Sequence, residues 1–170
     1  PLFSSHMSGA ESEGIPAGPY HFARPDLLAP GNTLKQDAKS EARYFSNAIQ
    51  SYLVPGNLRP VLDFEVNGNL TWTQLSSWVR WFMDEFVSLT GIEPIIYISS
   101  YYANNLDADL SEYDLWIAHW TYDLNVVPNI GNWGEWLVWQ YSNSGSVSGI
   151  NGRVDMNVSH TQVQDRILIN

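Results

Sequence analysis

Short apolar runs alternate with helical patterns through the first half of the chain, and this alternation limits the fold more than any other feature. The sequence predicts strands at 17–23, 61–66 and 94–99. Helices are predicted between them, beginning after Thr33 and Thr71, whose side chains can cap a helix. The second of these helices has an apolar stripe from Leu75 to Leu89 and is predicted to end at Gly91. A strand, a helix and a further strand connect as a right-handed unit with parallel strands. The pattern therefore indicates an α/β fold.

The second half continues the strands but loses most of the helices. It predicts strands at 115–119, 136–141 and 154–157, and a closing helix at 161–169. We expect a (β/α)-barrel variant with several helices missing in the second half, and an open doubly wound sheet is the second choice. The length of 170 residues fits one domain spanning 1–170. No Gly-rich phosphate loop follows a strand, so a nucleotide-binding fold has no support.

Charge and composition exclude several classes of partner and chemistry. Eighteen acidic residues against eight basic ones give a net charge of −10, which argues against nucleic acid or an anionic membrane. The apolar stretches are shorter than the ~20 residues of a membrane span. The chain has no cysteine, and its four histidines lack metal-ligand spacing. We therefore expect no metal, no cofactor and no membrane insertion.

Two acidic residues lie within the predicted strand at 61–66. Asp63 and Glu65 are two residues apart, so both face one side of the strand while Phe64 faces the other. Two such carboxyls repel each other, which tends to leave one protonated and the other ionised. Glycoside hydrolysis uses a pair of this kind, and the ~6.6 Å rise over two residues leaves its stereochemistry open. The alternative is an exposed strand end, or a pair neutralised by Arg24 or Arg59.

Other predicted strands also carry polar or aromatic residues late in their runs. In parallel sheets, functional residues gather at the carboxyl ends of the strands. Aromatic residues make up 14% of the chain, and a flat ring beside acidic groups suits a sugar; the alternative is simple core packing. The residues at the predicted strand ends are Tyr20, His21, Tyr97, Ser99, Trp116, His119, Trp120, Gln140 and Asp155.

Six motifs come in the order seen in glycoside hydrolase family 25, the lysozymes of the bacterial muramidase and phage endolysin type, and the chain resembles that family over essentially all of its length. The motifs are GPYHFARP at 18–25, DFE at 63–65, PIIYIS at 94–99, LWIAHW at 115–120, WQYS at 139–142 and GINGRVDMN at 149–157.

This resemblance implies an enzyme that cleaves the β-1,4 bond between N-acetylmuramic acid and N-acetylglucosamine in peptidoglycan. It implies Glu65 as the general acid and Asp63 as the second carboxylate, acting either as nucleophile or as partner of the substrate's N-acetyl group. Asp155 would be a further acid of the cleft. The resemblance also implies a secreted or phage-released enzyme, and we expect a monomer without a cofactor. The implied sugar-contacting residues are Tyr20, Tyr97, Trp116, Trp120 and Gln140.

The sequence departs from the family's pattern at its beginning. The family begins with a strand carrying Gly-Ile-Asp-Val-Ser, followed by a helix and a second strand, and no segment here matches them. We therefore expect a barrel that is truncated at the N-terminus relative to the family and has an open edge. The alternatives are that another segment supplies the missing elements, or that the sheet closes differently. Two other functions stay open: a catalytically impaired module that binds cell-wall glycan, and a hydrolase of another N-acetylated polysaccharide such as chitin.

Overall fold

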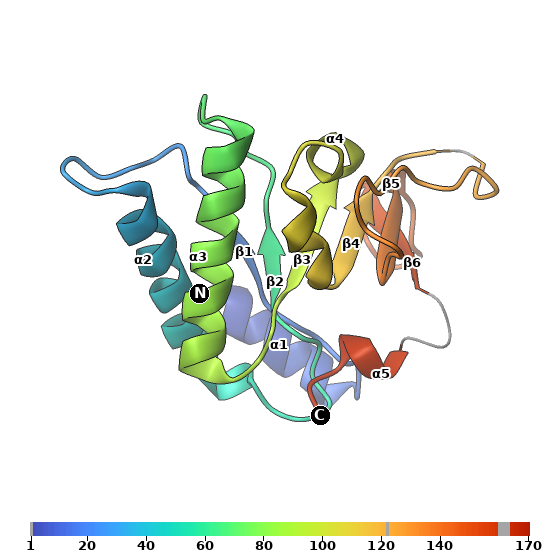
Figure 1. Ribbon diagram of the computed structural model, residues 1–170. Coiled ribbons are helices and arrows are strands. Elements are labelled where there is room, and N and C mark those ends of the chain that lie inside the picture. The colour runs from blue at the N-terminus through green and yellow to red at the C-terminus, as the bar shows by residue number, and fades with distance from the viewer. Residues whose placement is uncertain (1, 122, 160–163) are drawn as a thin grey trace.

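The computed structural model describes residues 2–121, 123–159 and 164–170, and its strands and helices alternate as expected (Figure 1). Two short 3-10 helices, Gln50–Tyr52 and Ala108–Glu112, supplement the main elements. No helix in these described ranges is long and apolar enough to cross a membrane. The main elements are α1 (Leu2–Ser12), β1 (Tyr20–Phe22), α2 (Leu34–Ile49), β2 (Val61–Asp63), α3 (Trp72–Thr90), β3 (Ile95–Ser99), α4 (Ser100–Ala103), β4 (Leu115–Ala118), β5 (Val138–Gly145), β6 (Val154–Ser159) and α5 (Gln164–Ile167).

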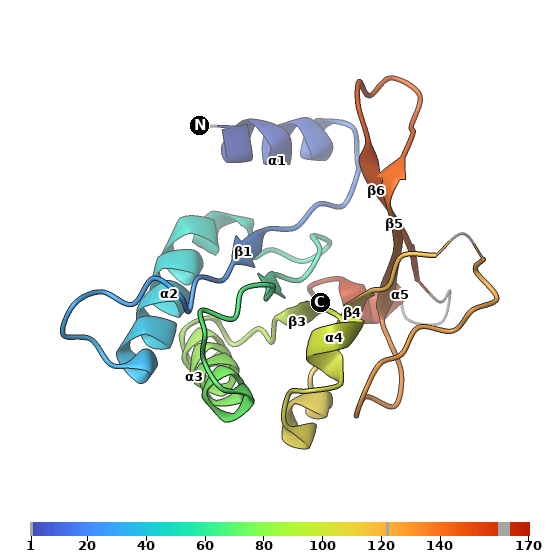
Figure 2. The ribbon, with the colours of Figure 1, turned by 90° about the horizontal axis from the view of Figure 1, so that it is seen from above.

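The strands form one six-stranded sheet in the order β1-β2-β3-β4-β5-β6. Neighbours from β1 to β5 are parallel, and β6 is antiparallel to β5. The chain crosses the sheet in one direction, without the reversal that defines a doubly wound sheet. Figure 2 shows the sheet curled, with α2, α3 and α4 on its outer side. This half-barrel confirms the predicted barrel variant, and the doubly wound alternative is wrong.

Both long helices begin, and α3 ends, where local signals place these termini. The Thr33 hydroxyl accepts a hydrogen bond from the backbone N–H of Gln36, whose side chain in turn accepts from the backbone of Thr33. Thr71 and Gln74 form the same capping box at α3. Such boxes satisfy backbone donors that the first helical turn leaves free. The predicted stop at Gly91 is also confirmed, since this residue adopts φ +71°.

The apolar faces of α2 and α3 pack against each other and against the sheet. Phe82 of α3 stacks on Phe86 and Trp78, and all three are fully buried. The Trp78 indole N–H donates to the buried Asp37 carboxylate at 2.9 Å, so its one polar atom is satisfied inside the core. Leu89, which the helical period placed on the same stripe, is exposed. This packing holds the outer side of the half-barrel together.

Several predicted strand ends differ from those observed. The strand predicted at 17–23 covers only Tyr20–Phe22, and the one predicted at 61–66 ends at Asp63. By contrast, β5 extends to Gly145 because it continues into an irregular hairpin with β6. The predicted closing helix at 161–169 corresponds to the short α5, and its part at 161–163 lies outside the described residues.

A clasp, formed by residues 56–59, Asp114 and residues 166–169, closes the amino end of the sheet. The backbone N–H of Ile169 donates to Asn57, and that of Arg59 donates to Ile167. The side chains of Arg59 and Arg166 both pair with Asp114, immediately before β4. At the sheet edge, within the described ranges, β1 pairs only with β2, as expected for an open edge.

Candidate active site

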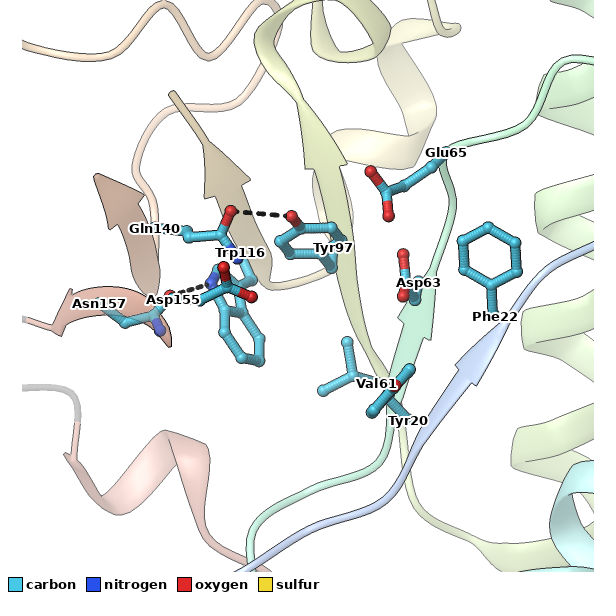
Figure 3. A pocket seen from close by; sticks show the side chains of 10 residues that line it. All are labelled: Tyr20, Phe22, Val61, Asp63, Glu65, Tyr97, Trp116, Gln140, Asp155 and Asn157. Atoms are coloured by element: carbon cyan, nitrogen blue, oxygen red, sulfur yellow. Dashed lines mark hydrogen bonds between the residues drawn. The ribbon is translucent and has the colours of Figure 1, made fainter. Parts of the chain in front are cut away.

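A cavity of about 470 Å³ lies on the inner face of the curled sheet, and all six strands contribute to it (Figure 3). We call this cavity the cleft. Seven of the eight predicted site residues line it: Tyr20, Asp63, Glu65, Tyr97, Trp116, Gln140 and Asp155. The fold therefore brings together side chains that are as far as 135 positions apart in the sequence.

The carboxyl end of β2 places the two acidic side chains. Although β2 ends at Asp63, the backbone N–H of Phe64 still donates to Tyr97 at 2.9 Å, which continues the extended path. The Tyr102 hydroxyl then donates to the backbone carbonyl of Glu65 at 2.7 Å. Phe64 is fully buried on the opposite side. The predicted alternation therefore holds beyond the strand, and Figure 3 shows the Asp63 and Glu65 carboxyls facing each other.

The Asp63 carboxyl is strongly perturbed. Its Oδ1 is buried and makes no hydrogen bond within the described part of the chain. Burial, and after it the charge and hydrogen bonding of Glu65, raise the pKa of Asp63 to about 7. A buried carboxyl beside a second one resists ionisation for both reasons. The pair thus keeps a proton into the neutral range, on the member nearer the sheet.

Within the described part of the chain no arginine pairs with Asp63 or Glu65, so the interpretation of a pair neutralised by Arg24 or Arg59 is wrong. Arg24 pairs with Asp26 at 2.7 Å, and Arg59 pairs with Asp114 in the clasp. The cleft lining contains neither Lys nor Arg. Within the described ranges, no cluster of three or more His, Asp or Glu residues is arranged to hold a metal ion.

The wall opposite the acidic pair is built from aromatic and amide side chains of β3 to β6. The Tyr97 hydroxyl donates to Gln140 Oε1 at 3.0 Å, and the Trp116 indole N–H donates to Asn157 Oδ1 at 2.9 Å. Burial, with the charges of Glu65 and Asp63, raises the pKa of Tyr97, so its hydroxyl stays neutral. Aromatic rings with fixed polar edges form a surface that a sugar ring can contact.

Some residues at the predicted strand ends lie elsewhere. Trp120 is 58% exposed and borders a neighbouring hollow of about 160 Å³, although its indole N–H reaches Gln140 at 2.8 Å. His21 faces α2 instead, where it contacts Glu41 at 2.7 Å. His119 contacts the Ser100 hydroxyl at 3.1 Å. Strand alternation explains why the His21 side chain points away from the cleft, because its neighbours Tyr20 and Phe22 occupy the cleft side.

Three residues that line the cleft were not singled out from the sequence. They are Phe22, Val61 and Asn157. Each lies two positions from a predicted site residue on the same strand, so the two-residue period of a strand is the signal that could have found them.

The protonated Asp63 predicts a pH-dependent stability. Between pH 4 and 7 the folded chain holds a proton at Asp63 that an unfolded chain releases, so the free energy of unfolding should fall as pH rises through this window. Asp63→Asn removes the titration. We expect this variant to be more stable than the wild type by about 1–2 kcal/mol at pH 8 and to gain little at pH 4. The expected gain is smaller than the full pKa shift of Asp63 would give, because solvent partly reaches this side chain. Urea unfolding of both proteins at pH 4 and pH 8 measures these stability differences. An equal difference between variant and wild type at the two pH values would contradict the prediction.

Comparisons with known proteins place the chain in a family. The model of the glycosyl hydrolases family 25 matches residues 1–150. The chain is 33% identical over 159 residues to the uncharacterized protein YegX of Escherichia coli O157:H7, covering 93% of this chain and 53% of that protein. It is 29% identical over 166 residues to lysozyme M1 of Streptomyces globisporus, covering 91% and 53%.

A solved structure gives the same result. The spore cortex lytic enzyme SleM of Clostridium perfringens matches with a TM-score of 0.80 and 28% identity, over 96% of this chain and 55% of that one. The chain spans about half the length of the curated relatives it matches. Asp155 and Asn157 come after the part that the family model matches. With its half-barrel, its cleft and these matches, the chain belongs to the glycosyl hydrolases family 25.

Proposed function

We propose that this chain is a lysozyme, an N-acetylmuramidase that hydrolyses the β-1,4 bond between N-acetylmuramic acid and N-acetylglucosamine in peptidoglycan. The observation that carries the proposal is the facing pair of carboxyls, Asp63 and Glu65, in a cleft lined with aromatic rings. Family membership and the similarity to lysozyme M1 support the same reaction class. A cell-wall substrate places the site of action outside the cytoplasm, and the proposed working form is a monomer.

In the proposed mechanism, Glu65 is the general acid. Its side chain is exposed in the cleft, whereas Asp63 lies deeper and holds the proton near neutral pH. Glu65 takes this shared proton and delivers it to the glycosidic oxygen as the bond breaks. Asp63, now ionised, stabilises the positive charge that develops on the sugar, either directly as nucleophile or through the N-acetyl group. Water then adds its hydroxyl to the anomeric carbon and returns a proton to the pair. The third acid, Asp155, faces the substrate from β6.

The products of peptidoglycan digestion test this proposal. We expect the chain to release soluble muropeptides that carry N-acetylmuramic acid at the reducing end, identified by borohydride reduction and mass spectrometry. N-acetylglucosamine at the new end would contradict the assigned bond. Binding to the wall without release would favour the glycan-binding module, and faster release from chitin oligomers than from peptidoglycan would favour the other hydrolase.

The proton held by the acidic pair predicts the pH dependence of the reaction. The general acid must be protonated, and the pair loses its proton near pH 7. We therefore expect kcat/KM to fall about tenfold per pH unit above pH 7. Initial rates on a soluble glycan between pH 5 and 9, with melting followed in parallel, measure this. A rate that stays level up to pH 9 would contradict the role of the pair.

A further inference from the structure

The amide of Gln140 is fixed in one orientation. Its Oε1 accepts two hydrogen bonds, from the Tyr97 hydroxyl at 3.0 Å and the Trp120 indole at 2.8 Å. Because an indole N–H can only donate, the atom facing Trp120 must be the oxygen. Gln140 is 4% exposed and lines the cleft, and its Nε2 makes no hydrogen bond within the described part of the chain. The amide can therefore only donate to a ligand.

Asn157 repeats this arrangement on the neighbouring strand. Its Oδ1 accepts from the Trp116 indole at 2.9 Å, and its Nδ2 makes no hydrogen bond with the residues that the structure describes. Gln140 and Asn157 are register partners of β5 and β6, so their side chains share one face of the sheet. Figure 3 shows both on the same side of the cleft, opposite Asp63. Two indoles thus orient two adjacent amides so that their nitrogens are free.

The same wall contains one carboxylate. Asp155 lies two residues before Asn157 on β6, and both line the cleft. The wall therefore offers two amide donors and one carboxylate, without a cation. A ligand carboxylate would meet three acidic side chains and no positive charge, which is unfavourable. A neutral group with one carbonyl and one N–H matches both the hydrogen-bonding groups of the wall and its lack of a positive charge.

We infer that Gln140 and Asn157 determine specificity by donating to the carbonyl oxygen of an acetamido group, whose N–H is accepted by Asp155. Trp120 and Trp116 are positioning residues that hold the two amides. This inference rests on the proposed function and deepens it. It assigns the selection of N-acetylated sugars to a wall that is separate from the acidic pair.

The experiment compares three forms of one peptidoglycan: native, N-deacetylated, and N-deacetylated then re-acetylated with acetic anhydride. We expect the wild type to cleave the native and re-acetylated walls at least about tenfold better in kcat/KM than the deacetylated wall. Asn157→Asp and Gln140→Glu keep an oxygen for the indole but replace the donor by a carboxylate. Each should reduce this preference about tenfold, because a carboxylate repels the carbonyl and attracts the ammonium of the deacetylated sugar.

The controls separate specificity from structure. Asn47→Asp makes the same change at an exposed position of α2 and should leave the preference unchanged. Trp116→Phe removes the N–H but keeps a ring, which lets the Asn157 amide rotate, so the preference should fall by less than in Asn157→Asp. If Asn157→Asp and Gln140→Glu slow both substrates equally and the preference persists, the inference is overturned.

A binding measurement keeps the two proposals distinguishable. Retention on the insoluble walls is measured with Glu65→Gln as the background, so cleavage is not needed. If the wild type releases no product but its retention still depends on acetylation and on Asn157, the lysozyme proposal fails and the inference stands. If retention is independent of acetylation, the inference fails whatever the activity.

Discussion

Glu65→Gln is expected to lower the release of reducing ends from peptidoglycan by about 10²–10⁴-fold, the usual contribution of a positioned general acid. Glutamine keeps the shape and polarity of the side chain but cannot deliver a proton to the glycosidic oxygen. The hydrogen bond from Tyr102 goes to the backbone carbonyl of Glu65, so the substitution leaves it in place. The measurement is the initial rate of reducing-end formation at saturating substrate.

Stability provides the control for this variant. Because the Glu65 side chain is exposed and forms no ion pair within the described part of the chain, the free energy of unfolding at pH 5, where Asp63 is protonated in the folded chain, should change by no more than about 0.5 kcal/mol. Glu11→Gln, at an exposed position of α1, is the matched change and should leave the rate unaltered. A Glu65→Gln chain that remains folded and releases reducing ends at the wild-type rate would rule out the assigned role.

Phe64→Ala is expected to destabilise the fold by about 3–5 kcal/mol, the range for removing a large aromatic side chain from a core. Phe64 is 0% exposed, and its ring lies 5.7 Å from each of the rings of Trp78 and Tyr102. Removing it leaves a cavity between β2, α3 and α4. Urea or thermal unfolding measures the loss.

A matched truncation on the surface makes this prediction specific. Tyr44 is 71% exposed on α2, so Tyr44→Ala should cost less than about 1 kcal/mol. Equal losses for the two variants would show that Phe64 does not stabilise the core as described. Because Phe64 lies between Asp63 and Glu65 in the chain, Phe64→Ala should also reduce catalysis in the fraction that remains folded.

The sequence predicted best what depends on neighbouring residues. The helix caps at Thr33 and Thr71 involve residues three positions apart, and the stop at Gly91 depends on one residue, so local chemistry determines all three. The facing acids followed from the two-residue period alone. The two-residue period could not predict where β2 ends, because the path beyond Asp63 depends on hydrogen bonds from distant residues, including the Tyr102 hydroxyl.

The opposite wall of the cleft could be predicted only in part. Aromatic residues were expected there, but the pairing of an indole with an amide joins Trp116 to Asn157 across 41 positions and Trp120 to Gln140 across 20. Such partners are determined by the register of β4, β5 and β6, which the sequence pattern does not specify. Asn157 was accordingly not singled out, although its motif was identified.

The clasp at the amino end of the sheet and the cleft use different residues, one set for stability and the other for the proposed chemistry. Arg59, Arg166 and Asp114 hold the base of the half-barrel together, whereas the groups proposed for chemistry line the cleft on its inner face. Evolution or protein engineering can therefore adjust heat tolerance at the clasp and substrate choice in the cleft as nearly independent properties. For the proposed activity on an insoluble polymer, this leaves room to raise the working temperature without changing the residues that line the cleft.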